Sequence, residues 1–151
     1  MLHRFKVASV VTALLLICGR AVVAQTLAVS GNPSALKITA AVAGSQPTSV
    51  SNSSTTYTIT TPNPNRTYKM TAQLDAAMPT GVTLTGTFAA PPGATSVGAV
   101  SLDVTARDVV TGIPRGTNST PGITYQLSAT VNAGVVTSTS RTVTLTIVRT
   151  S

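Results

Sequence analysis

Apolar and polar residues alternate along much of the chain, most clearly near its C-terminal end. Between residues 123 and 131, and again between 142 and 148, every second residue is apolar and its neighbours are mainly Thr, Ser or Gln. A period of two is typical of strands with one buried and one solvated face. The Gly- and Asn-containing interval at residues 132–138 separates the two runs, so we predict a hairpin that closes an antiparallel sheet.

The same alternation occurs earlier in the chain, with Pro and Gly between the alternating segments. These predicted strands cover residues 26–30, 36–42, 56–60, 67–75, 82–88 and 100–107. Residues 44–54 are rich in Ser, Thr, Gln and Pro and are predicted as a loop, and the sequence Met78-Pro79-Thr80-Gly81 predicts a tight turn. Residues 108–122 lack the pattern and are predicted as a long connection, with one helical turn around 107–110 as an alternative. About eight strands without helical periodicity predict an antiparallel sandwich or barrel.

Residues 1–24 have the composition of a secretory signal peptide. Arg4 and Lys6 make a basic start, residues 7–17 are apolar, and short side chains precede Gln25. This apolar run is well short of the roughly 20 residues that a bilayer-spanning helix needs. We therefore expect cleavage before Gln25, secretion, and no stable membrane span in the mature chain.

Cleavage leaves residues 25–151 as a single predicted domain. The alternatives are an uncleaved membrane anchor and a lipid anchor at Cys18. Cleavage removes the only His and the only Cys, and the seven remaining cations against three aspartates leave a net charge of +4 in place of +7. These cations are scattered, without a basic cluster or interleaved aromatic residues, so we do not expect nucleic-acid binding.

The predicted mature domain contains no His, Cys, Glu or Trp. This composition excludes a Ser-His-Asp triad, a cysteine nucleophile and a His-based zinc site. A carboxylate pair would have to use two of Asp75, Asp103 and Asp108, and a calcium site would rest on Asp103 and Asp108. A Ser-Lys dyad would need Lys37 or Lys69. The aspartates lie at strand ends or on a polar face, and both lysines occupy outward positions. We therefore predict a non-catalytic protein without catalytic, metal-binding or cofactor-binding residues.

Three segments match the N-glycosylation pattern, namely Asn52-Ser53-Ser54, Asn65-Arg66-Thr67 and Asn118-Ser119-Thr120. Chance matches are expected in a chain this rich in Ser and Thr. We interpret the three segments as markers of exposed loops.

The leader and three further segments resemble bacterial surface proteins of the immunoglobulin-like and fimbrial types, spore-coat-type secreted proteins included. The segments are MPTGVTLTG at residues 78–86, YQLSATV at 125–131 and SRTVTLTIV at 140–148. The resemblance implies an all-β, antiparallel, immunoglobulin-like sandwich of about seven to eight strands. The cysteine pair of many fimbrial subunits is absent from this chain.

The resemblance and the missing catalytic side chains together predict a structural or adhesive module of the cell envelope or extracellular space. Such a module would bind a protein partner or associate with itself through a sheet edge. Residues 26–30 could add to a neighbour's sheet, although pairing within their own sheet is the simpler interpretation. The alternative is a monomeric domain that binds a carbohydrate or a peptide through loops at residues 62–66 and 108–121.

Overall fold

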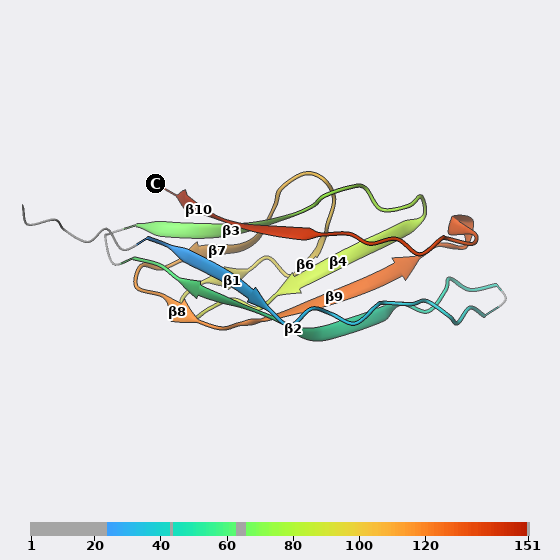
Figure 1. Cartoon of the computed structure of the whole chain (residues 1–151), viewed down its shortest axis with the longest axis horizontal. Helices are drawn as coiled ribbons and strands as arrows, with labels where there is room; N and C mark the ends of the chain where they lie inside the picture. Colours follow the sequence, from blue (N-terminus) through green and yellow to red (C-terminus); the bar gives the residue numbers. More distant parts are fainter. Residues whose placement is uncertain (1–23, 43, 63–65, 151) are drawn as a thin grey trace, which may run out of the picture.

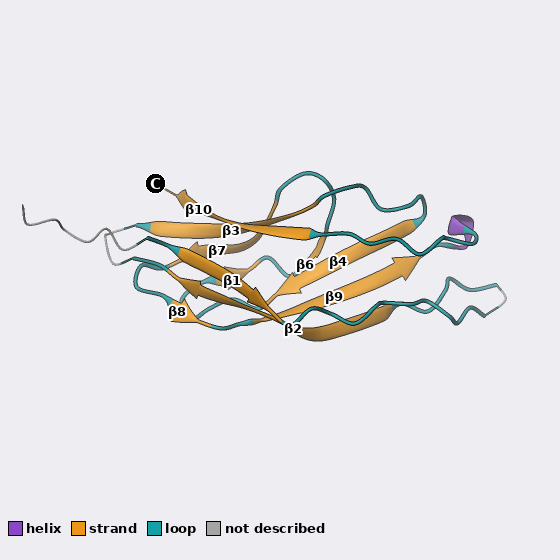
Figure 2. Cartoon of the chain, viewed as in Figure 1, coloured by secondary structure: helices purple, strands orange, loops and turns teal. Residues whose placement is uncertain are grey.

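The computed structural model describes residues 24–42, 44–62 and 66–150, which form two antiparallel sheets packed face to face (Figures 1 and 2). The first sheet contains, in spatial order, β1 (Thr26–Ser30), β2 (Val50–Thr60), β9 (Gly122–Ala129), β4 (Val82–Phe88) and β6 (Ala99–Ser101), with β8 (Asn118–Ser119) also beside β2. The second contains β10 (Val143–Thr150), β3 (Thr67–Leu74), β7 (Arg107–Ile113) and β5 (Thr95–Ser96). The all-β, antiparallel prediction is therefore confirmed.

The strand order differs from the immunoglobulin order that the resemblance implies. In an immunoglobulin domain, the first, second, fifth and fourth strands form one sheet, and the third, sixth and seventh form the other. Among the seven longest strands of this chain, the fifth (β7) and the sixth (β9) have exchanged sheets. From β2 onward these long strands alternate between the two sheets.

The predicted C-terminal hairpin is wrong, although both of its strands exist. β9 lies between β2 and β4 in the first sheet, whereas β10 pairs with β3 in the second, from Val143 opposite Leu74 to Thr150 opposite Thr67. The connection between them contains the short 3-10 helix Val131–Ala133 and crosses from one sheet to the other. Alternation determines which face of a strand is buried, but it does not select the partner strand.

Two predicted strands do not form as expected. Residues 34–41 keep a strand-like alternation, with Leu36 and Ile38 half-buried, but they have no ladder partner. The predicted strand at 100–107 is cut short after β6, because the Asp103 carboxylate accepts a hydrogen bond from the Thr105 amide (2.8 Å) and closes a turn.

β7 is a core strand in the stretch predicted as a connection, so the helical-turn alternative is wrong as well. Val109 and Val110 are both fully buried although they are neighbours in sequence. The pairing of β3 with β7 shifts register between Met70 and Thr71, which marks a bulge that interrupts the regular alternation of side chains between the two faces. The bulge removes the period of two on which the prediction depended.

The core lies between the sheets and is built from the apolar faces that alternation predicts. Its fully buried larger side chains include Tyr57, Ile59, Met70, Phe88, Ile113 and Ile123. Gly86 leaves room for the Phe88 ring, since a Cβ atom at Gly86 would lie 2.7 Å from that ring. Aromatic and aliphatic burial of this kind supplies most of the stabilisation of a domain without disulfides.

A pair of buried threonines joins the end of β2 to the turn after β7. Thr61 donates its hydroxyl to the Pro114 carbonyl (2.9 Å) and accepts a hydrogen bond from the Thr117 amide (2.9 Å). Thr117 also donates its hydroxyl to the Pro114 carbonyl (2.7 Å). By contrast, the Thr55 hydroxyl is buried without a hydrogen-bond partner in the described part of the chain.

We expect Thr61→Val to lower the free energy of unfolding by about 2 kcal/mol, because it leaves the buried Thr117 amide without a partner. The matched change Thr55→Val should leave stability unchanged or raise it by up to about 1 kcal/mol, since no hydrogen bond is removed. Urea unfolding of both variants measures the difference. Equal destabilisation by the two changes would contradict this account.

Candidate functional site

The three aspartates do not converge. Asp103 pairs with Arg107 (2.5 Å) and Asp108 pairs with Lys69 (2.9 Å), whereas Asp75 accepts a hydrogen bond from the Thr142 amide (3.0 Å). Within the described residues, no group of three or more His, Cys, Asp or Glu side chains is arranged to hold a metal ion. Each aspartate therefore takes part in a local structural contact.

The Arg107 guanidinium and the Thr105 amide hold the pKa of the Asp103 carboxyl below its usual range. The same ion pair raises the pKa of Arg107. Both groups are solvent-exposed, and exposed ion pairs contribute little to stability. A lowered carboxyl pKa in this setting has a structural cause and provides no general acid or base.

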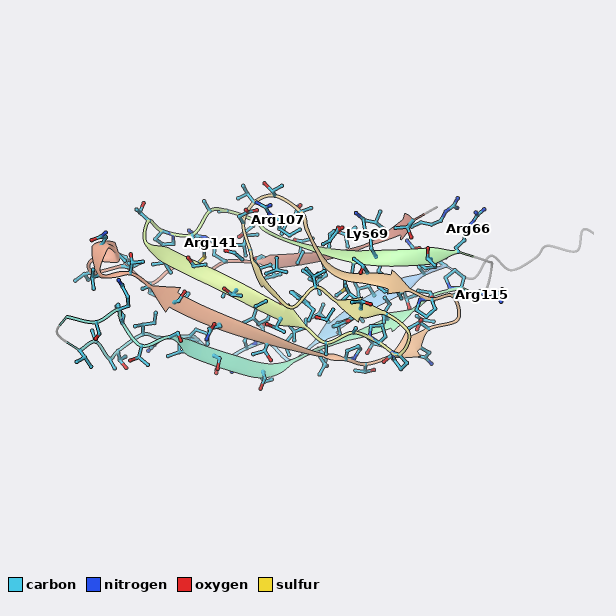
Figure 3. The ribbon with its side chains drawn as sticks, turned by 180° about the vertical axis from the view of Figure 1, so that it is seen from behind. Arg66, Lys69, Arg107, Arg115 and Arg141 are labelled. Carbon is cyan, nitrogen blue, oxygen red and sulfur yellow. The ribbon has the colours of Figure 1, made fainter. Side chains whose placement is uncertain are left out.

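The lysines proposed for a Ser-Lys dyad form no such pair in the described part of the chain. Lys69 forms an ion pair with Asp108, and Lys37 is exposed on the extended segment 34–41. Figure 3 shows Arg66 and Arg115 near one end of the molecule and Arg141 and Arg107 farther along it.

The predicted loop sites are placed differently from their expected positions. Asn52 lies in β2, where its amide group donates to the Ser34 hydroxyl (3.0 Å), and Asn118 is exposed in β8. The third Asn of the glycosylation pattern, Asn65, lies outside the described residues, as does most of the predicted loop 62–66. The other predicted binding loop contains β7, which packs in the core.

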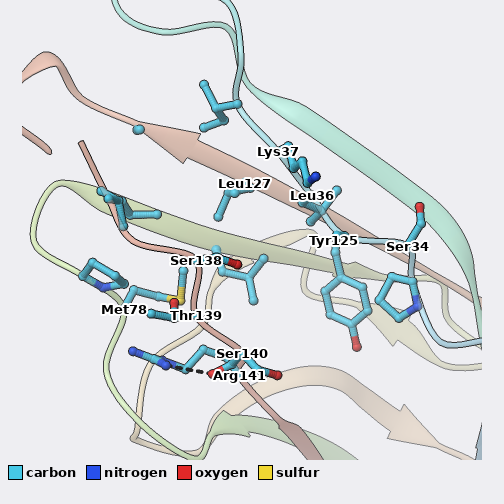
Figure 4. Close-up of a pocket in the computed structure, with 18 of the residues that line it drawn as sticks. Ser34, Leu36, Lys37, Met78, Tyr125, Leu127, Ser138, Thr139, Ser140 and Arg141 are labelled. Carbon is cyan, nitrogen blue, oxygen red and sulfur yellow. Dashed lines mark hydrogen bonds between the residues drawn. The ribbon is translucent and has the colours of Figure 1, made fainter. Parts of the chain in front are cut away.

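The structure contains a recess that the sequence did not predict. It is a groove of about 1690 Å³ between the two sheets, and Figure 4 shows part of its lining. Its lining is mixed, with many Ser and Thr residues beside apolar residues that include Leu36, Met78, Leu84, Tyr125, Leu127 and Val143. Lys37 and Arg141 are the only Lys or Arg residues among the lining residues, and no Asp is among them. The Arg141 guanidinium is held by the Ala77 carbonyl (2.8 and 3.0 Å).

The groove exists because one sheet extends farther than the other. β4 and β9 continue to Val82 and Ala129, whereas β3 ends at Leu74 and the paired part of β10 begins opposite that residue. Beyond this point, irregular segments at residues 78–79 and 133–142 line the groove instead of a paired strand. The length difference between strands of opposite sheets is a tertiary property, so alternation along the sequence carried no signal for it.

The rim of the groove carries backbone groups without partners. No backbone amide of residues 31–42 donates to a carbonyl within the described part of the chain. Two carbonyls of this stretch accept hydrogen bonds: the Ala40 carbonyl accepts from the Thr48 amide (3.0 Å), and the Val42 carbonyl accepts from the Ser45 amide (3.0 Å). Among the described strands β10 pairs only with β3, so its second edge is open to any chain that the described residues do not supply. Unpaired strand edges are templates for the addition of another chain.

The fold and the groove define a two-sheet β-sandwich with one partly open side. In comparisons with known proteins, no family model matches the chain, and no characterised protein or solved structure is significantly similar to it. None of the helical structure in the described residues is long and apolar enough to cross a membrane.

Proposed function

We propose that this chain is a secreted, non-catalytic structural or adhesive module of the cell envelope or extracellular space, with residues 1–24 as its signal peptide. The single observation that carries the proposal is the groove, which combines apolar side chains in a mixed lining with an open strand edge. Its lining offers no carboxylate for acid–base chemistry. A surface of this kind suits a polypeptide chain, because backbone hydrogen bonds supply affinity and alternate side chains fill the recess.

The outer faces of the sandwich are consistent with a scaffold role. In β10, the exposed residues Thr144 and Thr146 alternate with half-buried apolar residues. Threonine suits the pleated backbone through its branched Cβ and is hydrated through its hydroxyl. A face of this composition is well hydrated and carries no reactive side chains.

The second candidate function is peptide binding by a monomer, and the groove favours it over carbohydrate binding. Tyr125 is the one aromatic residue among the lining residues, whereas carbohydrate sites usually present several. The site would then be the groove and not the predicted loops. An extended apolar peptide is the ligand class that fits its lining.

Processing and location of the full chain test the secreted role. We expect expression in a secreting bacterial host to yield extracytoplasmic protein whose intact mass corresponds to a chain that starts at Gln25. Replacing Leu15 with Arg in the apolar run should retain the unprocessed chain inside the cell. Unprocessed wild-type protein in the cytoplasm would overturn the secreted role.

Capture of envelope proteins on the purified protein tests the module role, with substitutions in and outside the groove. Leu36→Lys places a charge in the groove, and Thr87→Lys places the same charge on the exposed outer face of β4. We expect the first variant to abolish retention of envelope proteins and the second to preserve it. Equal retention by both variants, or none by the wild type, would overturn a role for the groove.

A further inference from the structure

Two features of this chain complement each other. Residues 34–41 form a strand-like segment without a ladder, and β10 is a ladder strand with one open edge. In the segment, Leu36 and Ile38 are half-buried and their neighbours exposed. In β10, Val143 and Leu145 are half-buried in the same alternating way. The two stretches therefore have the same period and the same division into an apolar and a polar face.

Both features border the same groove. Residues 31–41 line one wall and residues 136–143 the opposite wall, so β10 reaches the groove with its first residue, Val143. Figure 1 shows the segment after β1 running beside β2 in the lower part of the view and the chain before β10 running along the upper part, and the groove lies between them. One side of the sandwich thus carries both an unpaired extended segment and an open sheet edge.

We propose that two copies of this chain form a closed dimer in which residues 34–41 of each copy pair with the open edge of β10 in the other. A second copy is a sufficient partner because one chain supplies both halves of the contact. Both halves lie on one side, so a two-fold axis lets each copy give and receive one strand pairing. Such a contact is self-complementary and stops at two copies, unlike a head-to-tail contact that grows into a fibre.

Charged residues near residues 34–41 and near the β10 edge favour a second copy of the chain as the partner. Two of the three aspartates are paired with cations, whereas Asp75 has no Lys or Arg nitrogen within 4.0 Å in the described part of the chain. Asp75 lies beside Thr142, at the start of the β10 edge. Lys37 is exposed on the unpaired segment and also has no carboxylate partner among the described residues. A reciprocal contact brings this cation and this anion to the same interface.

The dimer also covers apolar surface that a monomer leaves open. Val29 is 55% exposed at the end of β1 and Val136 is 39% exposed beside the groove, and both belong to its lining. Contiguous apolar surface of this kind marks interaction sites in soluble proteins.

Light scattering with size-exclusion chromatography on the purified protein, as the secreting host processes it, tests the dimer. We expect twice the mass of one chain at micromolar concentration. The variants Thr39→Pro and Ala40→Pro locate the contact, because successive amides of an extended chain point to opposite edges. Neither amide donates to a backbone carbonyl of the described residues, so both variants should fold. One of the two variants removes an amide that points to the outer edge and donates across the interface, and a two-fold dimer loses this hydrogen bond in both strand pairings. That variant should raise the dissociation constant of the dimer by about tenfold or more, whereas the other should leave it unchanged.

A second pair of variants tests the β10 edge. Leu145→Lys places a charge on its apolar face and should abolish the dimer, whereas Thr144→Lys places the charge on the exposed face and should preserve it. Circular dichroism and thermal unfolding check that both variants are folded. A monomeric wild type, open fibres, or a dimer indifferent to all four substitutions would each overturn the proposal. The inference goes beyond the proposed function, because a monomer that is still secreted and retains envelope proteins would leave that function intact.

Discussion

Replacing Phe88 with Ala should lower the free energy of unfolding by about 3–5 kcal/mol. The Phe88 side chain is fully buried. Its ring meets Tyr125 edge to face, with centroids 6.3 Å apart and planes at 86°, and it covers Gly86. Phe88 lies opposite Ile123 in the pairing of β4 with β9, so its loss opens a cavity where two central strands meet. A loss of this size is a large share of the roughly 5–15 kcal/mol that stabilises a typical domain.

Urea unfolding of the purified protein measures this loss, and two variants calibrate it. Phe88→Leu keeps most of the apolar volume and should cost about 1–2 kcal/mol. Val148→Ala trims a side chain that is 37% exposed on β10 and should change stability by less than about 0.5 kcal/mol. If Phe88→Ala is no more harmful than Val148→Ala, the ring is not part of the core described here.

The buried faces of several strands could be predicted from the sequence because the signal is local. Alternation places Tyr57 and Ile59 on one face of β2, and both are fully buried. The same holds for the inward residues of β3 from Tyr68 to Leu74 and for Phe88 in β4. In each case the side-chain period of an extended backbone decides the face, whatever strand lies beside it.

Pairing could not be predicted in this way, since it depends on residues far apart in sequence. β9 and β10 are consecutive long strands with matching patterns, yet they lie in different sheets. The neighbours Val109 and Val110 are both buried at a bulge that only the register with β3 creates. A turn at this place could be predicted because its chemistry is local, but it lies one residue later than the predicted 78–81: the Val82 amide donates to the Pro79 carbonyl (3.0 Å), and Gly81 has a φ of +77°.

The candidate site was missed for the same reason. The sequence directed attention to aspartates, lysines and loops, and the structure assigns these groups to surface contacts and a core strand. The groove results from a difference in strand length between two sheets. The one sequence signal that bears on it is the alternation at residues 36–42, which predicts a strand where the structure has an extended segment without a ladder.

Alkaline solution is expected to destabilise the protein through Tyr57. The Tyr57 hydroxyl donates to the Ala89 carbonyl (2.5 Å) and its side chain is fully buried, and this burial raises the pKa of Tyr57 to about 12. Because the folded-state pKa lies above the unfolded value of 10.0, the stabilisation is fully present below pH 10 and is lost as the pH rises toward 12. The loss amounts to up to about 2–3 kcal/mol. Burial also raises the pKa of Tyr125, which acts in the same direction.

The variant Tyr57→Phe separates this effect from general alkaline damage. Near neutral pH it should cost about 1 kcal/mol, because the Ala89 carbonyl loses its donor. Above pH 10 the wild type should lose stability faster than the variant, so the difference between them should shrink and then reverse. Urea midpoints measured at a series of pH values, with tyrosinate absorbance as a monitor of ionisation, follow both proteins. Parallel pH dependence of the two would show that ionisation of Tyr57 is not coupled to unfolding.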